Sequence, residues 1–229
     1  MSVSNRDTPI NVLTTYYDAM FAAFGPQGWW PARTRFEVIV GAILTQNTAW
    51  TNVEAAIKEL KAAGLLRPEA MHRAGLAHIA RCIRSAGYFN VKARRLKNFT
   101  DYLFERHGGS LDRLFKTDGA TLRSTLLGLN GIGPETADSI ILYAAGKPEF
   151  VIDAYTKRIF SRHGLISEAA GYDEVKALFT GCLPPDAALF NEYHALIVVT
   201  AKEFCKSRKP VCEACPLKAY LGKGAKGCL

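Results

Sequence analysis

The sequence predicts an almost entirely α-helical protein, and three observations support this fold class. Apolar residues recur at intervals of three or four through most of the chain, as they do on one face of a helix. Runs in which apolar and polar residues alternate, as in a half-buried strand, are scarce. Glycines, which commonly end helices, punctuate the periodic segments at Gly25, Gly64, Gly87, Gly108, Gly131 and Gly164.

The elements can be justified in chain order. Helical spacing places the first two helices over the apolar positions Val12, Tyr16, Met20, Phe24 and then Ile39, Ile43, Leu44. Further on, FVIDAYTKRIF (150–160) begins with a β-branched run that would suit a short strand. We expect it instead to enter a helix capped by Asp153, or to form a bend whose acid faces a cleft. The tract GKPE (146–149) is expected to join two lobes.

The composition is that of a globular protein with an anionic partner. Of the 229 residues 48% are hydrophobic, and 29 lysines and arginines exceed 21 acids, which gives a formal charge of +8. The basic excess is clustered in KARRLK (92–97), KRIFSRH (157–163) and KEFCKSRK (202–209). Such clusters favour a polyanion as the partner. Solvated helix faces are the alternative.

The sequence does not support a membrane protein or a secreted protein. No apolar run approaches the roughly 18 residues that a membrane span needs, and MSVSNRDTPIN lacks a signal-peptide core. We therefore expect a cytoplasmic protein. Cysteines rarely form disulfides in a reducing compartment, so a cluster among the six cysteines predicts a metal site.

The most informative motif is LNGIGPETADSIIL (129–142). Gly131 and Gly133 allow positive φ and let backbone N–H groups approach an anion, and the helix that follows adds the positive end of its dipole. A lone Gly-x-Gly is weak, but here a leucine-rich helical run precedes it and an amphipathic helix start follows. The motif is therefore a helix-hairpin-helix candidate. The phosphates of a nucleic-acid backbone suit it, because such contacts position a duplex without reading its sequence.

LNGIGPETADSII followed by VIDAYTKRIF resembles the helix-hairpin-helix DNA glycosylase superfamily that includes endonuclease III, over about Trp29 to Cys215. The resemblance implies a two-lobed, all-α helix-hairpin-helix glycosylase fold. The central lobe would be residues 35–146, and residues 1–34 plus 147–229 would form the second lobe with a cysteine-rich loop. Asp153 matches the family's essential aspartate, whose carboxylate stabilises positive charge on the sugar and orients or deprotonates a water. A helix cap without a catalytic role is the alternative.

Glu135 departs from the family pattern. Members that both excise a base and cut the strand carry a lysine there, whose amine attacks C1′ of the sugar and forms a Schiff base. Glutamate cannot form that adduct, so the resemblance implies a monofunctional glycosylase in which water is the nucleophile. An acid favoured by the helix dipole in the first turn is the structural alternative.

The tryptophans of the chain, Trp29, Trp30 and Trp50, all fall within GWWPARTRFEVIVGAILTQNTAW (28–50). With LTQNT and the glutamate at position 135, this segment resembles the 3-methyladenine DNA glycosylase III branch. Alkylated purines are cationic, and a desolvated indole face attracts a flat cation by about 1 to 2 kcal/mol. We therefore expect the three tryptophans and Glu135 to form the base pocket. Core packing is the alternative for the tryptophans.

Other residues are expected to contact DNA. GAILTQNT resembles the helix whose glutamine or asparagine fills the gap left by a flipped nucleotide, so Gln46 is expected in that role and Asn47 is a weaker candidate. Further expected DNA contacts are Gly131, Gly133, Thr136, Tyr155 and Lys157. Tyr155 and Lys157 have a helix surface position as the alternative. His194, in an apolar helical segment, is expected to be a packed core histidine.

Cys205, Cys212 and Cys215 are spaced C-x6-C-x2-C. In endonuclease III relatives the same spacing, completed by a cysteine after five more residues, binds a [4Fe–4S] cluster through thiolates. That position is Leu221, so we expect Cys228, beyond twelve intervening residues, to complete a structural cluster. A zinc ion held by four thiolates, or no metal, are the alternatives.

The expected function is excision of alkylated bases, 3-methyladenine first among them, from double-stranded DNA in base excision repair. The enzyme is expected to act as a nucleoid-associated monomer. The rivals are an endonuclease III-like glycosylase for oxidised or mismatched bases and a non-catalytic DNA-binding protein.

Overall fold

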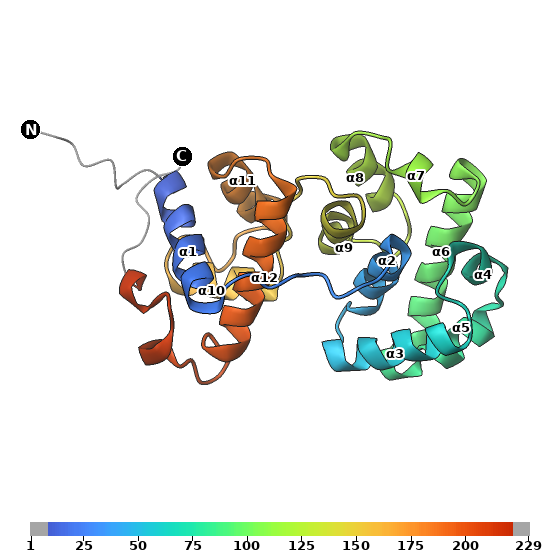
Figure 1. Cartoon of the computed structure of the whole chain (residues 1–229), viewed down its shortest axis with the longest axis horizontal. Coiled ribbons are helices and arrows are strands. Elements are labelled where there is room, and N and C mark those ends of the chain that lie inside the picture. The colour runs from blue at the N-terminus through green and yellow to red at the C-terminus, as the bar shows by residue number, and fades with distance from the viewer. Residues whose placement is uncertain (1–8, 222–229) are drawn as a thin grey trace, which may run out of the picture. The chain divides into compact units, whose positions relative to one another are not determined.

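A computed structural model of the chain describes residues 9–221, and every regular element within this range is a helix (Figure 1). The predicted all-α fold class is confirmed. Helices α1, α3, α6 and α10 end within two residues of glycines with positive φ, as the sequence predicts. None of the described helices is long and apolar enough to cross a bilayer.

The described residues form two compact units. One is Trp30–Lys147, and the other combines the described parts of Met1–Trp29 and Pro148–Leu229. The helices of the first unit are α2 (Arg35–Leu44), α3 (Trp50–Ala62), α4 (Pro68–Arg73), α5 (Leu76–Cys82), η1 (Arg84–Ala86), α6 (Phe89–His107), α7 (Leu111–Leu114), α8 (Gly119–Leu127), α9 (Pro134–Ser139) and the π-helical η2 (Ile140–Ala144). Those of the second are α1 (Pro9–Phe24), α10 (Ala154–Arg162), α11 (Tyr172–Cys182), α12 (Ala187–Glu203), η3 (Cys212–Ala214) and η4 (Lys218–Tyr220).

Helix α2 is the central helix of the first unit. Thr34 caps it by accepting a hydrogen bond of 3.1 Å from the backbone N–H of Glu37. Every residue from Phe36 to Leu44 is buried, because α2 packs against α3, α6, α9 and η2. The buried Glu37 carboxylate is paired with Lys61 of α3 at 2.6 Å. This burial fixes the point where α2 ends and the segment that carries Gln46 begins.

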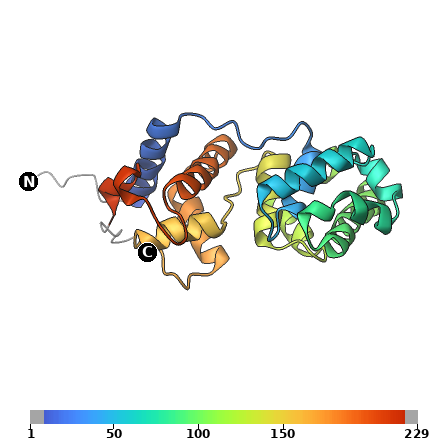
Figure 2. The same ribbon diagram turned by 90° about the horizontal axis from the view of Figure 1, so that it is seen from below.

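The second unit is built around an aromatic core. The rings of Phe150 and Phe179 stack with centroids 4.0 Å apart, and Phe190 and Tyr193 meet the Phe150 ring edge-on. The Tyr193 hydroxyl donates to the carbonyl of Leu13 at 2.8 Å, which joins α12 to α1. Helix α12 packs against both α1 and α10 (Figure 1 and Figure 2).

The tract 150–160 is a helix entry and contains no strand. The side chains of residues 150–152 are buried in the second unit, and the Ile152 N–H donates to the Tyr172 hydroxyl at 3.3 Å. Asp153 then caps α10 by accepting a hydrogen bond from the backbone N–H of Thr156. The expectation of a helix capped by Asp153 is confirmed.

Candidate active site and nucleic-acid interface

The helix-hairpin-helix candidate folds as a hairpin between α8 and α9. Gly131 has a φ of 96°, in the region that favours glycine. A Cβ there would overlap with Cγ of Arg95, so only glycine fits beneath that side chain. Gly133 does not adopt the positive φ that glycine allows, because its φ is −93° and its ψ is 179°. Gly133 is the N-cap of α9, and an N-cap residue adopts extended backbone.

A buried ion pair holds α9 against α8. The carboxylate of Asp138 is fully buried, and Arg123 donates to its Oδ1 from Nε at 2.8 Å and to its Oδ2 from Nη2 at 3.5 Å. Removing one partner from a buried pair is costly, because a buried charge then remains without compensation. The pair therefore fixes the start of α9 relative to the hairpin.

Glu135 lies in the exposed first turn of α9, directly after Pro134 at the first helical position. Its carbonyl accepts a hydrogen bond of 2.7 Å from the Ser139 hydroxyl, and the helix continues through η2 as far as Ala144. The position near the positive end of the helix dipole favours an acid. The structure thus places a carboxylate on the surface beside the hairpin, where the family pattern implies a lysine.

Gln46 ties the segment after α2 to the hairpin. Its Nε2 donates to the carbonyl of Gly131 at 3.0 Å and to Oγ1 of Thr136 at 2.9 Å, while its Oε1 accepts from Arg95. Both ends of the amide are therefore bonded within this unit, and its insertion into DNA, which stays a prediction, requires these bonds to break. Thr136 is buried and its hydroxyl holds the amide, and its contact with DNA stays a prediction. Asn47 beside it is exposed, with a φ of 52°.

The KARRLK tract serves mainly internal bonds. Lys92 is buried, and the guanidinium of Arg95 bonds to the glutamine amide described above. Lys97 pairs with Asp101 at 3.0 Å and also bonds to a backbone carbonyl. Arg94 is the exposed arginine of the tract. The expectation that this tract faces a polyanion is therefore wrong for Lys92, because a fully buried ammonium cannot reach a phosphate.

Two of the predicted pocket tryptophans lie together. The rings of Trp30 and Trp50 meet edge-to-face with centroids 5.2 Å apart, and Tyr143 of η2 packs on Trp30 at 5.0 Å. A Cβ on Gly41 of α2 would lie 3.2 Å from the Trp30 ring, so the absence of a side chain there makes room for the indole. Trp29, the third predicted member, belongs to the other compact unit. The cluster is half-buried and packs against the core of the first unit.

Asp153 is held by two hydrogen-bond donors and lies beside a histidine. Its Oδ1 accepts from the backbone N–H of Thr156 at 2.7 Å and from the Thr156 hydroxyl at 2.9 Å. Its Oδ2 lies 3.5 Å from Nε2 of His194 on α12, and the two side chains are only 12% and 7% exposed. His194 is therefore not simply a packed core histidine, as the sequence suggests, because it faces the carboxylate.

The environment keeps Asp153 ionised. Burial opposes ionisation, but His194 and then the two Thr156 donors outweigh it, so the pKa of Asp153 lies below its usual value. The result is a fixed anion in a protected position. A carboxylate of this kind can stabilise positive charge on a sugar ring and can accept a proton from water.

The basic residues of α10 anchor the segment that follows α12. Arg158 donates from Nε to the carbonyl of Cys205 at 2.7 Å, and Arg162 bonds to the carbonyls of the next two residues at 2.8 Å. Lys157 donates to the carbonyl of Ala170 at 2.7 Å. The guanidinium of Arg158 also lies 5.0 Å from the ring centroid of Tyr155. Contacts of Tyr155 and Lys157 with DNA stay predictions.

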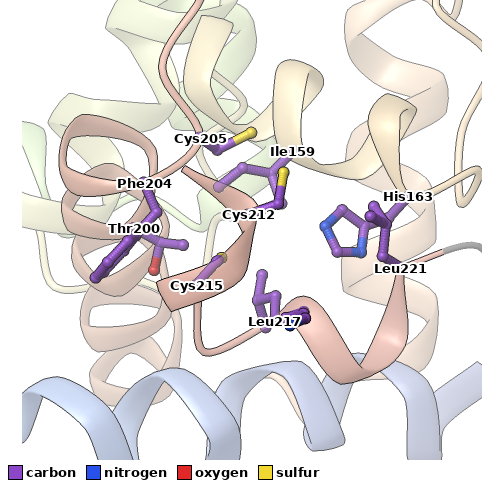
Figure 3. Close-up of a pocket in the computed structure, with 10 residues that line it drawn as sticks. Ile159, His163, Thr200, Phe204, Cys205, Cys212, Cys215, Leu217 and Leu221 are labelled. Carbon is purple, nitrogen blue, oxygen red and sulfur yellow. The ribbon is translucent and has the colours of Figure 1, made fainter. Parts of the chain in front are cut away.

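Three cysteines line one pocket between α10, the end of α12 and η3 (Figure 3). Cys205, Cys212 and Cys215 share it with His163. Cys205 Sγ accepts a hydrogen bond of 3.3 Å from Arg162. Burial, and then the nearby Cys205 and Cys212, raise the pKa of the Cys215 thiol. Cys228 lies outside the described residues.

Two observations bear on the metal site that the cysteine spacing predicts. Within residues 9–221 no three His, Cys, Asp or Glu side chains are grouped so that they could hold one metal ion. A [4Fe–4S] cluster presents four irons, so its thiolates surround it instead of converging on one point. Hydrogen bonds to the sulfurs are a recurrent feature of such sites, and Arg162 supplies one here.

Sequence reasoning missed two residues near these sites. The contact of His194 with Asp153 joins two helices. Helical spacing in the sequence predicts that His194 is buried, but it does not predict which residue His194 contacts. Tyr88 is 73% exposed and has a φ of 45°, which is rare for an aromatic residue. The preceding Gly87 marked a helix boundary, but no pattern in the sequence indicates that an aromatic side chain stands in solvent there.

The fold and this hairpin define a helix-hairpin-helix DNA repair protein. Residues 40–185, which include the hairpin and Asp153, match the HhH-GPD superfamily of base excision DNA repair proteins, and the chain belongs to this superfamily. It is an endonuclease III-like DNA glycosylase of the base excision repair pathway.

Relatives and solved structures agree with this assignment. A protein of Methanocaldococcus jannaschii, named provisionally as a DNA repair glycosylase, is 47% identical over 217 residues, which cover 94% of this chain and 98% of the relative. Endonuclease III of Sulfolobus acidocaldarius is 31% identical over 189 residues, 82% of each chain.

Among solved structures, endonuclease III in a non-covalent complex with DNA has the same fold, with a TM-score of 0.79, 22% identity and coverage of 93% of this chain and 96% of that one. The 3-methyladenine DNA glycosylase of H. pylori bound to 1,N6-ethenoadenine has a TM-score of 0.71 and 27% identity, with coverage of 85% of this chain and 97% of that chain.

Proposed function

We propose that this protein is a monofunctional glycosylase that excises alkylated bases, such as 3-methyladenine, from double-stranded DNA. The observation that carries the proposal is the combination of a surface glutamate, Glu135, at the hairpin with a buried and hydrogen-bonded aspartate, Asp153. Glutamate has no amine with which to form a Schiff base at C1′. Water is then the nucleophile, and Asp153 is the carboxylate that acts on it.

The surroundings of Asp153 support this mechanism. As the N-glycosidic bond breaks, its electron pair leaves with the base and positive charge develops on the sugar. A carboxylate already fixed by Thr156 and His194 stabilises that charge without reorganising. Water adds to C1′, and its proton passes to the carboxylate or to solvent. A cationic alkylated base leaves as a neutral molecule, so the reaction needs little acid catalysis.

The aromatic cluster supports an alkylated base as the substrate. Several aromatic rings lie together in the first unit, from Trp30, Trp50 and Tyr143. An electron-rich ring face attracts a cationic base by about 1 to 2 kcal/mol when water is excluded. Each factor of ten in selectivity requires about 1.4 kcal/mol. The similarity to the H. pylori 3-methyladenine enzyme supports the same choice.

The second candidate is an endonuclease III-like glycosylase for oxidised or mismatched bases, and the 31% identity to a curated endonuclease III favours it. A panel of duplexes, each with one lesion, separates the two functions. The panel contains 1,N6-ethenoadenine, 3-methyladenine, thymine glycol and a uracil–guanine mismatch, and base release is scored after alkaline cleavage. Release of the alkylated purines supports the proposal. Release of only the oxidised or mismatched bases would assign the second function, and no release from any duplex would leave a DNA-binding protein.

We also propose that Cys205, Cys212 and Cys215, with Cys228, hold a [4Fe–4S] cluster that pins the segment after α12 in place. Protein prepared without oxygen should be brown and contain about four irons per chain. Cys228→Ala should lose iron, whereas the matched variant Cys82→Ala, in the other unit, should retain it. If Cys228→Ala keeps its iron and His163→Ala loses it, the fourth ligand is the histidine that lines the same pocket.

A further inference from the structure

Two surface segments of the first unit carry residues in the left-handed region. The segment after α2 contains Asn47 with a φ of 52°, and the turn before α6 contains Tyr88 with a φ of 45°. Asparagine tolerates this region, but a tyrosine there is strained unless its surroundings hold it. Both side chains are exposed. Some interaction must therefore keep this backbone in place while the side chains face solvent.

The ammonium of Lys92 supplies that interaction. Although it lies in a basic tract, its side chain is only 1% exposed. Its Nζ donates to the carbonyl of Leu44 at 2.7 Å, to Oγ1 of Thr48 at 2.5 Å and to the carbonyl of Ala86 at 2.8 Å. The Thr48 hydroxyl donates in turn to the carbonyl of Ala86 at 2.6 Å. All three ammonium protons therefore have partners, and the partners come from both segments.

The three acceptors lie next to the exposed residues in the chain. Leu44 is the last residue of α2, where carbonyls lack helical partners and the helix dipole favours a cation. Thr48 directly follows Asn47, and Ala86 lies two residues before Tyr88. Gln46, in the same segment, is braced separately by Arg95 and the hairpin. One buried cation thus joins the two segments immediately beside their exposed side chains.

We propose that Lys92 is a positioning residue that locks these two segments into one rigid unit, which presents Asn47 and Tyr88 to the DNA helix beside a displaced base. The inference rests on the proposed function, in which a base leaves the stack and protein side chains occupy the opened step. Lys92 makes no contact with DNA. Its removal therefore weakens the recognition of an opened site and leaves general attraction to phosphates unchanged.

Other roles for Lys92 do not fit the geometry. A phosphate contact requires an exposed ammonium, and this one is buried. Burial and the neighbouring Arg95 lower the pKa of Lys92 to about 8, which is a property of lysines that form Schiff bases. However, its nitrogen is enclosed by three protein acceptors and cannot reach a sugar carbon.

The test compares Lys92→Met with Arg94→Met, an exposed arginine on the same helix that serves as the matched control. Affinity is measured for a duplex with a tetrahydrofuran abasic-site analogue and for the same duplex undamaged, at several salt concentrations. A 2-aminopurine beside the analogue reports unstacking by its fluorescence. Thermal unfolding and circular dichroism check that each variant is folded.

Lys92→Met should lose about tenfold or more in affinity for the abasic-site duplex and most of the fluorescence rise. Its affinity for undamaged DNA and the salt dependence should match the wild type. Arg94→Met should keep the fluorescence rise and the preference for the abasic site. A wild-type fluorescence rise in Lys92→Met would overturn the inference. So would a salt slope lower by about one, because that is the signature of a lost phosphate contact.

A second variant covers the case in which Lys92→Met does not fold. Thr48→Ala keeps the lysine and removes the acceptor beside Asn47, and it should lose part of the fluorescence rise, whereas an unchanged rise would overturn the inference. The outcomes also separate the inference from the proposed function. One outcome is that the wild type releases no alkylated base while Lys92→Met or Thr48→Ala still has a lower affinity for the abasic-site duplex and a smaller fluorescence rise. In that case the proposed function fails and the positioning role of Lys92 stands.

Discussion

The starts of α9 and α10 both present an acid, and the comparison between them shows how surroundings decide chemistry. Glu135 lies in the exposed first turn of α9, beside the hairpin. Asp153 caps α10, is nearly buried and faces His194. The positive end of a helix dipole stabilises the negative charge of both acids. Thr156 and His194 hold the carboxylate of Asp153 in a protected position, where it can act on a developing cation.

The difference arises in the packing behind each helix. The start of α9 is fixed by the ion pair between Arg123 and Asp138, which lies about one turn beyond Glu135. The start of α10 is backed by α12, which brings His194 to Asp153. We therefore expect substitutions at α10 to change catalysis, and those at α9 to change stability.

Asp153→Asn should have the largest effect. The amide keeps the size of the side chain but cannot stabilise positive charge or accept a proton from water, so base release should fall by about 10²- to 10⁴-fold. Single-turnover base release from a duplex containing 1,N6-ethenoadenine measures the loss. Affinity for an abasic-site analogue should stay within about threefold of the wild type. Unchanged base release would remove Asp153 from the mechanism.

Arg123→Met tests the other helix start through stability. It leaves the fully buried Asp138 without its partner and should lower the free energy of unfolding by about 3 kcal/mol. Urea denaturation measures the change, and Arg106→Met, an exposed arginine on α6, should stay within about 0.5 kcal/mol of the wild type. A loss below about 1 kcal/mol would mean that the pair does not hold α9.

His194→Gln should shift the pH dependence of base release. The pKa of Asp153 is depressed, so its contacts contribute stability above the unfolded-state value of about 3.9 and lose it as the pH falls through the lower folded value. Burial raises the pKa of Asp153 and His194 lowers it, so the pKa of Asp153 rises when His194 is removed. Base release by the variant should be about tenfold below the wild type near pH 5, with a smaller difference near pH 8. An equal loss at all pH values would show that His194 acts in another way.

Glu135→Gln should have the smallest effect. The side chain is exposed, and a neutral amide of the same size removes its charge near the helix start, which is worth about 0.3 to 1 kcal/mol. Base release should remain within about threefold of the wild type under the conditions used for Asp153→Asn. A loss as large as that of Asp153→Asn would show that Glu135 takes part in the reaction.

The sequence predicted the elements of the fold better than their contacts. Helical spacing, glycine boundaries and the cap at Asp153 are local signals, and the structure confirms them. His194 could not be paired with Asp153 from the sequence, because the contact depends on how α12 packs on α10. The sequence predicted one base pocket for Trp29, Trp30 and Trp50, and the structure shows that the rings of Trp30 and Trp50 meet. Tyr143 joins these two rings through the π-helical turn, which has no sequence signature.

The basic tracts illustrate the same limit. Clustered charge indicates an anionic partner, but it does not show which cations are exposed. Lys92 and Arg95 bind groups within the first unit, and Arg158 and Arg162 hold the segment that carries the first cysteine of the tract. Net charge therefore indicates the kind of partner, but it does not indicate which residues contact that partner.

Borohydride trapping on a duplex with a natural abasic site tests the central claim most directly, because it detects a Schiff base between protein and sugar. The wild type should form no covalent adduct, since Glu135 offers no amine. Glu135→Lys places an amine at the same exposed position and should form one, which shows that the position reaches the sugar. A trapped adduct with the wild-type protein would contradict the assignment of a monofunctional glycosylase.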